Sequence, residues 1–225
     1  MPDLTPDLLL RVFLWFVAFL FSTTCHEAAH ALVAKWGGDP TAALGGQVTL
    51  NPIPHIRREP FGMVLVPLLS CVISNGGSMI GWASAPYDPS WQRRYPRRAA
   101  RMALAGPAAN FTLMMIAGVL FRLSVQGQWF AANQSGGGQE LILNTLLIFF
   151  SLNLLLGTFN LLPVPPLDGS TALALVMPER MALRYLDWVN ESGFRMFGLI
   201  IAILLFRQIF VYIQGFAFHV LRSGL

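Results

Sequence analysis

The sequence has few charged side chains for its length. Asp, Glu, Lys and Arg make up only 12% of its 225 residues, and Lys35 is the only lysine. A soluble domain carries about 25% charged residues, so this shortage, together with 55% hydrophobic residues, indicates an integral membrane protein. The basic stretch WQRRYPRRAAR, residues 91–101, suits an anionic lipid surface. Nucleic acid is the weaker interpretation, because no soluble domain presents the patch.

Cysteines are scarce too, and the first residues are not typical of a signal peptide. Cys25 and Cys71 both lie in apolar runs, where a thiol packs as a small hydrophobic group and no disulfide is expected. The N-terminal MPDLTPDLLLR is acidic and has neither the positive segment nor the small-residue cleavage site of a signal peptide. We therefore expect the first apolar run to remain as a membrane helix.

Long apolar runs fill most of the remaining chain. Four can cross about 30 Å of hydrocarbon at about 1.5 Å per residue, and they cover residues 8–33, 99–122, 141–162 and 194–220. A fifth run, residues 61–82, is ambiguous, because Pro67 and SNGGS would free backbone groups that need new partners in lipid. We predict a single domain, residues 1–225, that is an all-α polytopic membrane protein.

Two segments between these runs are expected at the membrane surface. GQVTL, residues 46–50, has strand character, which predicts a short β hairpin or edge strand. Residues 163–191 begin with clustered prolines and continue as an interfacial helix interrupted by Pro178.

The segment FSTTCHEAAHALV places three ionisable groups at the end of the first apolar run. His26, Glu27 and His30 match H-E-x-x-H, in which two histidines one helical turn apart share a face and can bind one zinc ion. Glu27 could then take a proton from zinc-bound water. A chance match on a solvated helix is the alternative, but ionisable groups in membrane segments are costly and usually functional. The motif therefore predicts a metal site.

A catalytic zinc ion needs a third protein ligand. Asp168 is the preferred candidate, because it follows prolines that break the chain after the third spanning run. Irregular backbone at membrane depth must line a cavity or be buried in protein. His55 is the alternative; as a surface-loop residue in NPIPHI it could instead have an outer or substrate-binding role. Asn110 is expected to bond between helices.

Three segments together resemble the site-2 protease family of intramembrane zinc metalloproteases. They are HEAAH, GPAAN at residues 106–110 and FNLLPVPPLDG at residues 159–169, while GDPTA, TLNPIPH and GWASAP are similar to the minimal prokaryotic branch. The resemblance implies that His26, His30 and Asp168 bind one zinc ion and that Glu27 is the catalytic acid and base. It also implies that Asn160 lies near the substrate.

The two ligand segments constrain the topology. Ligands of one ion must lie on the same side of the membrane, so an even number of crossings must separate the end of residues 8–33 from the end of residues 141–162. Residues 61–82 should then be re-entrant. This arrangement gathers most basic residues on one side, which the positive-inside rule places in the cytoplasm. We expect a multi-pass protein of the cell membrane with the N-terminus outside and the active site toward the cytoplasm.

The expected activity is hydrolysis of peptide bonds in or near transmembrane segments. The partners would be membrane-protein substrates and the lipid bilayer, without nucleic acid. An extended substrate could pair with the edge of GQVTL by strand addition. The alternative is a metal-binding membrane protein without catalysis, such as a transporter or a scaffold. A transporter usually has repeated halves, which the sequence lacks, and a dead protease would be expected to lose Glu27 first.

Overall fold

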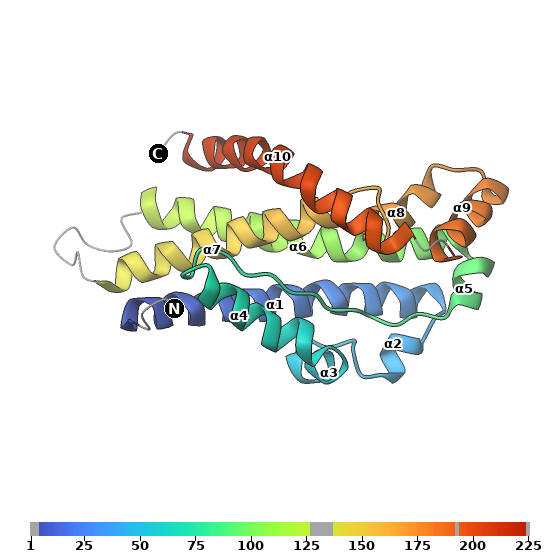
Figure 1. The fold of residues 1–225 in the computed structure, drawn as a ribbon, viewed down its shortest axis with the longest axis horizontal. Coiled ribbons are helices and arrows are strands. Elements are labelled where there is room, and N and C mark those ends of the chain that lie inside the picture. Colours follow the sequence, from blue (N-terminus) through green and yellow to red (C-terminus); the bar gives the residue numbers. More distant parts are fainter. Residues whose placement is uncertain (1–4, 127–136, 192–193, 224–225) are drawn as a thin grey trace.

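Four long helices form the body of the protein (Figure 1). The computed structural model describes residues 5–126, 137–191 and 194–223. The long helices are α1 (Pro6–Gly37), α6 (Pro96–Gln126), α7 (Gly137–Asn160) and α10 (Phe194–Arg222). All four are long and apolar enough to cross a membrane, which confirms that the four apolar runs predicted as spans form long helices.

Local sequence explains where α1 begins and ends. The Thr5 hydroxyl accepts a hydrogen bond from the amide of Leu8, and Pro6 occupies the first turn, where its missing N–H costs nothing. The helix ends at Gly38, which has φ = 98°, a left-handed conformation that glycine adopts without steric cost. One unbroken helix therefore carries the whole H-E-x-x-H motif.

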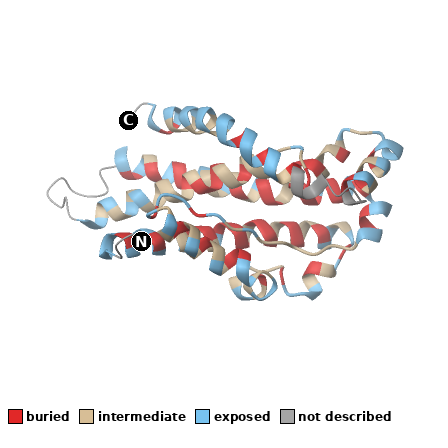
Figure 2. Cartoon of the chain, in the orientation of Figure 1, coloured by how far each residue is buried: buried red, intermediate tan, exposed pale blue. Residues whose placement is uncertain are grey.

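The central helix is α6, which packs against α1 on one side and α7 on the other. The buried residues follow these contacting faces (Figure 2). In contrast, α10 packs mainly against α6 and α7, and most of its described residues are exposed or half-buried. Most of its large exposed side chains are apolar, as expected for a helix that faces lipid, although Arg207 and Gln208 are exposed as well. The apolar ones are Ile200, Ile201, Ile203, Leu204, Leu205, Ile209, Val211, Tyr212, Phe216 and Val220.

Residues 61–88 run along α1 toward its N-terminal end and then return (Figure 1). A π-helical turn (Phe61–Leu65) leads into α4 (Val66–Ile73), and together they are too short to count as a spanning helix. The chain then reverses and comes back in extended form to α5 (Pro89–Arg94). The Ser70 hydroxyl accepts a hydrogen bond from the amide of Ile80, which fastens the returning chain to α4.

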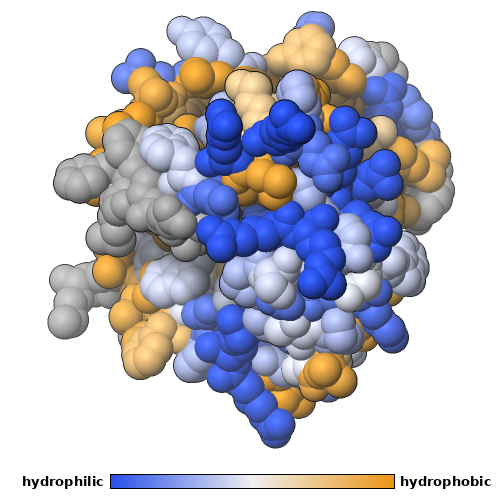
Figure 3. All heavy atoms as spheres, turned by 90° about the vertical axis from the view of Figure 1, so that its right-hand side faces the viewer, coloured by the Kyte–Doolittle hydropathy of each residue, from blue (hydrophilic) through white to orange (hydrophobic). Residues whose placement is uncertain are grey.

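Shorter helices collect at the end of the bundle that holds α5. They are α2 (Thr41–Leu44), α3 (Pro52–Arg58), α8 (Asp168–Ala172) and α9 (Glu179–Glu191), with a 3₁₀ turn at Leu173–Leu175. α9 begins after Pro178, as predicted, and its buried Ala182 and Leu186 pack against Ala100 of α6. Hydrophilic side chains cover much of this end when it is viewed face on (Figure 3).

The β hairpin or edge strand predicted at residues 46–50 is wrong, since the described residues contain no strand. The backbone N–H of Gln47 donates to the Ala42 carbonyl at 3.0 Å and so closes the turn after α2. Asn51 accepts a hydrogen bond from the amide of Ile53 at 3.0 Å and caps α3. With a turn on one side and a helix cap on the other, the segment has no partner strand with which to form a ladder.

Candidate metal centre

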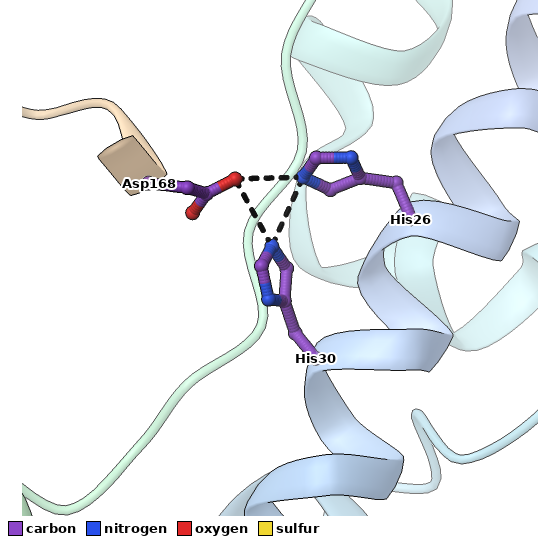
Figure 4. Close-up of side chains that lie close together, drawn as sticks. All are labelled: His26, His30 and Asp168. Atoms are coloured by element: carbon purple, nitrogen blue, oxygen red, sulfur yellow. Dashed lines mark hydrogen bonds and ion pairs between the residues drawn. The ribbon is translucent and has the colours of Figure 1, made fainter. Parts of the chain in front are cut away.

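His26 and His30 lie one turn apart on the same face of α1 (Figure 4). Their Nε2 atoms are 3.0 Å apart, and each residue is only 7% exposed. Because side chains four residues apart on a helix stand one above the other, the helix itself brings the two ring nitrogens together.

Asp168 reaches the same place from a distant part of the chain. It begins α8 immediately after the proline-rich turn. A Cβ on Gly169 would collide with the backbone of Leu161, so only glycine lets the chain return this closely on itself. The turn directs Asp168 Oδ2 to 3.1 Å from Nε2 of His26 and 3.2 Å from Nε2 of His30 (Figure 4).

The three ligand atoms form a nearly equilateral triangle with sides of 3.0, 3.1 and 3.2 Å. A tetrahedral zinc ion with bonds of about 2.0–2.1 Å holds its ligand atoms about 3.3–3.4 Å apart, so the donor set fits zinc with a small adjustment. Within the described residues, this is the one group of three His, Cys, Asp or Glu side chains whose ligand atoms all lie within 4.8 Å of one another. Three protein ligands leave the fourth tetrahedral position for water or substrate.

The outer nitrogens of both imidazoles also have oxygen partners. His30 Nδ1 lies 2.7 Å from the carbonyl oxygen of Met102. That carbonyl can only accept, so in the neutral ring Nδ1 carries the proton and Nε2 presents a lone pair to the centre. His26 Nδ1 lies 2.6 Å from Oδ1 of Asn110, which joins α1 to α6 as expected for this asparagine. Histidine ligands of metals usually donate their second N–H to an oxygen in this way.

Gly106 of α6 faces the two imidazoles. A Cβ built on this residue would collide with the Nε2 atoms of both His26 and His30. Any side chain larger than hydrogen would therefore press on the two nitrogens that point to the centre.

Glu27 follows His26 on α1 and is also buried, with 6% of its surface exposed. Its carboxylate makes no hydrogen bond to another described residue, but it lies close enough to His30 to interact with it electrostatically. A buried carboxylate without a fixed partner, beside a candidate metal centre, can accept a proton from a bound water.

The chain matches the model of peptidase family M50 over residues 14–205. It belongs to that family. This M50 chain is 32% identical over 183 residues to "Putative zinc metalloprotease YwhC" of Bacillus subtilis, an alignment that covers 80% of this chain and 76% of that protein. It is 34% identical over 163 residues to "Putative zinc metalloprotease Rip2" of Mycobacterium tuberculosis, covering 72% of this chain but only 57% of the relative. No solved structure gives a significant match.

Two other residues that the sequence singled out in this M50 chain make hydrogen bonds elsewhere and none to the three ligand residues. His55 is 1% exposed within α3, so its expected place in a surface loop is wrong. Its Nε2 lies 3.1 Å from the carbonyl oxygen of Thr49, and its Nδ1 lies 3.5 Å from Nε2 of Gln47. Asn160 ends α7, and its amide nitrogen donates to the Leu156 carbonyl at 3.0 Å.

One polar residue next to the centre was missed by sequence reasoning. Asn153 of α7 is fully buried, and its Oδ1 accepts a hydrogen bond from Nδ2 of Asn110 at 2.9 Å. The signal for it was present, because a lone amide inside the apolar run LLIFFSLNLLLG is costly in a membrane unless it has a role.

Proposed function

We propose that this M50 chain is an intramembrane zinc metalloprotease, which hydrolyses peptide bonds in or near transmembrane segments of membrane proteins. The observation that carries the proposal is the meeting of His26, His30 and Asp168 at one point, beside the buried Glu27. Membership of the family, the names of the relatives and the four apolar helices support it.

His26, His30 and Asp168 would hold one zinc ion per chain. Three electron-pair donors lie within 3.2 Å of one another, and a shared cation relieves their mutual repulsion. When bound, zinc lowers the pKa of a water ligand toward about 7 and polarises the carbonyl that is to be attacked. The side chain of Asp168 is 23% exposed, against 9% and 8% for the histidines, so water has its access on the aspartate side.

Glu27 would act first as general base and then as general acid. Its carboxylate accepts the proton of the attacking water and later returns that proton to the leaving amine. The position of Glu27, directly after a ligand on an unbroken helix, holds it beside the reacting atoms without involving it in the ligand set.

The extended segment 76–88 is the proposed substrate-binding element, because it runs along α1 past the centre (Figure 1). Gly76 lies against the Arg11 side chain, and the Asp88 amide donates to Asp39 Oδ2 at 2.8 Å. Gly76 still belongs to the turn after α4, and from there to Asp88 the segment can reach at most about 40 Å, while the chain from Arg11 to Asp39, mostly α1, covers about 42 Å. The two elements therefore run parallel with matched lengths.

This register puts Ala83 and Ser84 at about the level of His26 and His30. One edge of the segment is occupied, since the Trp82 amide donates to a carbonyl of the π-helical turn at 3.0 Å and the Ser84 carbonyl accepts from a glutamine side chain at 3.0 Å.

The opposite edge of the segment is open. The N–H and C=O groups of Ala83 and Ala85 have no hydrogen-bond partner among the described residues. An unwound substrate segment could pair with this edge by strand addition, in place of the edge expected at residues 46–50. Asn160 is retained as a proposed contact to the substrate backbone, because only its amide nitrogen is engaged. His55 is not, because both of its ring nitrogens have local partners.

The proposed topology places the end of the molecule shown in Figure 3 in the cytoplasm. Exposed basic side chains gather there, which suits the positive-inside rule and an anionic lipid surface: Lys35, Arg57, Arg58, Arg93, Arg94, Arg97, Arg98, Arg101, Arg180 and Arg184. The start of α1 lies at the other end of the bundle, so the proposed topology has the N-terminus outside (Figure 1). Residues 61–82 would then enter the membrane from the cytoplasmic side and return to it.

A metal-binding membrane protein without catalysis, the second possibility raised by the sequence, gains no support from the fold. A site that only binds metal has no need for Glu27, which is buried beside the ligands and has no hydrogen-bond partner among the described residues.

Cleavage of a fluorescently labelled single-span membrane protein by the purified chain in detergent tests the proposal. We expect cleavage that stops when a chelator removes the metal and returns when zinc is added back. A purified, zinc-loaded chain that cleaves none of a panel of single-span proteins would contradict the proposed function.

A further inference from the structure

A buried chain of side-chain hydrogen bonds runs from the candidate metal centre across two helix interfaces. His26 Nδ1 lies 2.6 Å from Asn110 Oδ1, and Asn110 Nδ2 donates to Asn153 Oδ1 at 2.9 Å. Asn153 Nδ2 in turn donates to two oxygens at 2.9 Å, the hydroxyl of Ser22 and the backbone carbonyl of Phe149. Both asparagines and Ser22 are fully buried, so water does not compete for these bonds.

The Phe149 carbonyl determines which group donates in each of these hydrogen bonds, because a backbone carbonyl can only accept. It requires the nitrogen of the Asn153 amide to face it, which leaves the Asn153 oxygen facing Asn110. That oxygen requires the nitrogen of the Asn110 amide, which leaves the Asn110 oxygen facing His26. An amide oxygen also only accepts. In its neutral form, His26 therefore carries its proton on Nδ1 and keeps a lone pair on Nε2, the atom that faces Asp168.

We propose that Asn153 is a positioning residue that sets the tautomer of His26 through Asn110 and thereby prepares Nε2 to bind the metal. The proposal rests on the proposed zinc site and adds residues of α7 to it, although none of them touches the metal. A reversed pair of amides would present an N–H donor to His26, favour the proton on Nε2, and block the atom that has to bind zinc.

The two imidazoles differ in how their tautomers are set. His30 donates directly to a backbone carbonyl, that of Met102 in α6, and a backbone carbonyl in a helix cannot turn around. His26 has only an asparagine beside it, and an isolated amide could present either end. Asn153 removes that freedom by linking Asn110 to a carbonyl of α7. The Phe149 carbonyl thus sets the tautomer of His26 through two side-chain amides, whereas the Met102 carbonyl sets the tautomer of His30 directly.

Simple cohesion between helices is the competing explanation for these four polar residues, since buried polar side chains often join membrane helices. The two explanations rank substitutions at Asn153 differently. Asn153→Asp keeps an oxygen that accepts from Asn110 but loses both donated hydrogen bonds and buries a charge. Asn153→Leu removes the acceptor while keeping a similar shape. If the residues only hold the helices together, Asn153→Asp should lose more zinc affinity than Asn153→Leu. If Asn153 orients Asn110, Asn153→Leu should lose more.

The experiment compares these two variants with the wild type as full-length, folded protein in detergent. Zinc affinity is measured by competition with a chromogenic chelator. Nitrogen NMR of metal-free protein labelled at histidine, at mildly alkaline pH, reports which ring nitrogen of His26 carries the proton. Loss of the signal in His26→Gln assigns the resonance. Ser124→Ala is the matched control. It removes a buried hydroxyl of α6 that donates to a carbonyl of its own helix.

We expect His26 to be protonated on Nδ1 in the wild type, in Asn153→Asp and in Ser124→Ala. In Asn153→Leu we expect a mixture of tautomers and a roughly tenfold loss of zinc affinity, at the low end of the range for residues outside the ligand set. The proposal is overturned if Asn153→Leu keeps a single tautomer and wild-type affinity, or if Asn153→Asp loses as much affinity as Asn153→Leu.

A second pair of variants applies if Asn153→Leu does not yield folded protein. Asn110→Asp keeps an oxygen for His26 to donate to, and Asn110→Leu does not, so the same ranking of tautomer and affinity is expected one step closer to the metal. The NMR signature also separates this proposal from the proposed function. A wild type that binds no zinc would contradict the protease, while the tautomer of its metal-free His26 would still decide the role of Asn153.

Discussion

The Oδ2 atom of Asp168 lies 3.1 Å from Nε2 of His26, although the two residues are 142 positions apart in the chain. The contact joins the start of α8 to α1. Both ring nitrogens at this point and the carboxylate oxygen are electron-pair donors, and they share the geometry that a tetrahedral cation requires.

Substitution of Glu27 should separate metal binding from turnover. Glu27→Gln keeps the size of the side chain and leaves the three ligand atoms untouched, so zinc content should stay at the wild-type level. The amide cannot accept the proton of the attacking water, and cleavage of a labelled single-span substrate should fall by about 10²–10⁴-fold. Glu179→Gln on the exposed start of α9 is the control and should cleave normally. Normal cleavage by Glu27→Gln would end the general-base assignment.

Removal of Asp168 should empty the metal site. Asp168→Ala leaves two imidazoles as the protein ligands, and zinc affinity should fall by more than about 100-fold, the upper range for residues outside the ligand set. Metal analysis after dialysis against a weak chelator measures the loss. Asp187→Ala removes a surface carboxylate that pairs with Arg93 and should retain its zinc. Equal zinc content in the two variants would transfer the third-ligand role to another group.

Addition of one methyl group at position 106 should disturb both histidines at once. In Gly106→Ala the new Cβ would collide with the two Nε2 atoms, and crowding of this kind costs about 1–3 kcal/mol. We expect zinc affinity to fall by more than about tenfold while the helix content by circular dichroism stays the same. Gly215→Ala on α10, where an added Cβ meets nothing within 4 Å, is the control. Unchanged zinc affinity in Gly106→Ala would show that the two imidazoles can move away from α6 and still bind the metal, and would contradict the need for glycine at this position.

Blocking the open edge of residues 76–88 should impair substrate binding without loss of the metal. Ala83→Pro removes an N–H that has no partner in the described chain and so costs no internal hydrogen bond. We expect a higher KM for a transmembrane substrate with zinc content unchanged. Ala83→Ser, which keeps the amide and nearly the same size, should behave as the wild type. If the two variants cleave equally well, the substrate does not pair with this edge.

Cysteine labelling in intact cells tests the proposed orientation. In a background in which Cys25 and Cys71 are replaced by alanine, Thr5→Cys and Leu44→Cys place single exposed thiols at opposite ends of the bundle. A membrane-impermeant maleimide should label the first variant in intact cells and the second only after the cells are opened. The reverse pattern would show that the protein has the opposite orientation in the membrane.

Some features of the protein follow from short-range patterns in the chain. Length and hydropathy determine the four spans, because each helix satisfies its own backbone in lipid without help from distant residues. The helical period places His26 and His30 on one face for the same local reason. The proline-rich break before Asp168 also marks, within the sequence, a place where the chain must leave the helix.

Other features could be decided only by the tertiary structure. GQVTL has the composition of a strand, but strands need a partner, and the fold supplies a turn and a helix cap instead. The need for glycine at position 106 arises from two imidazoles on another helix. The bonds from the Phe149 carbonyl through Asn153 and Asn110 to His26 cross three helices. The sequence by itself determined the helices and the candidate ligands, since those depend on near neighbours. Packing alone decided which ligands meet and how they are held, since contacts between distant residues leave no periodic trace in the chain.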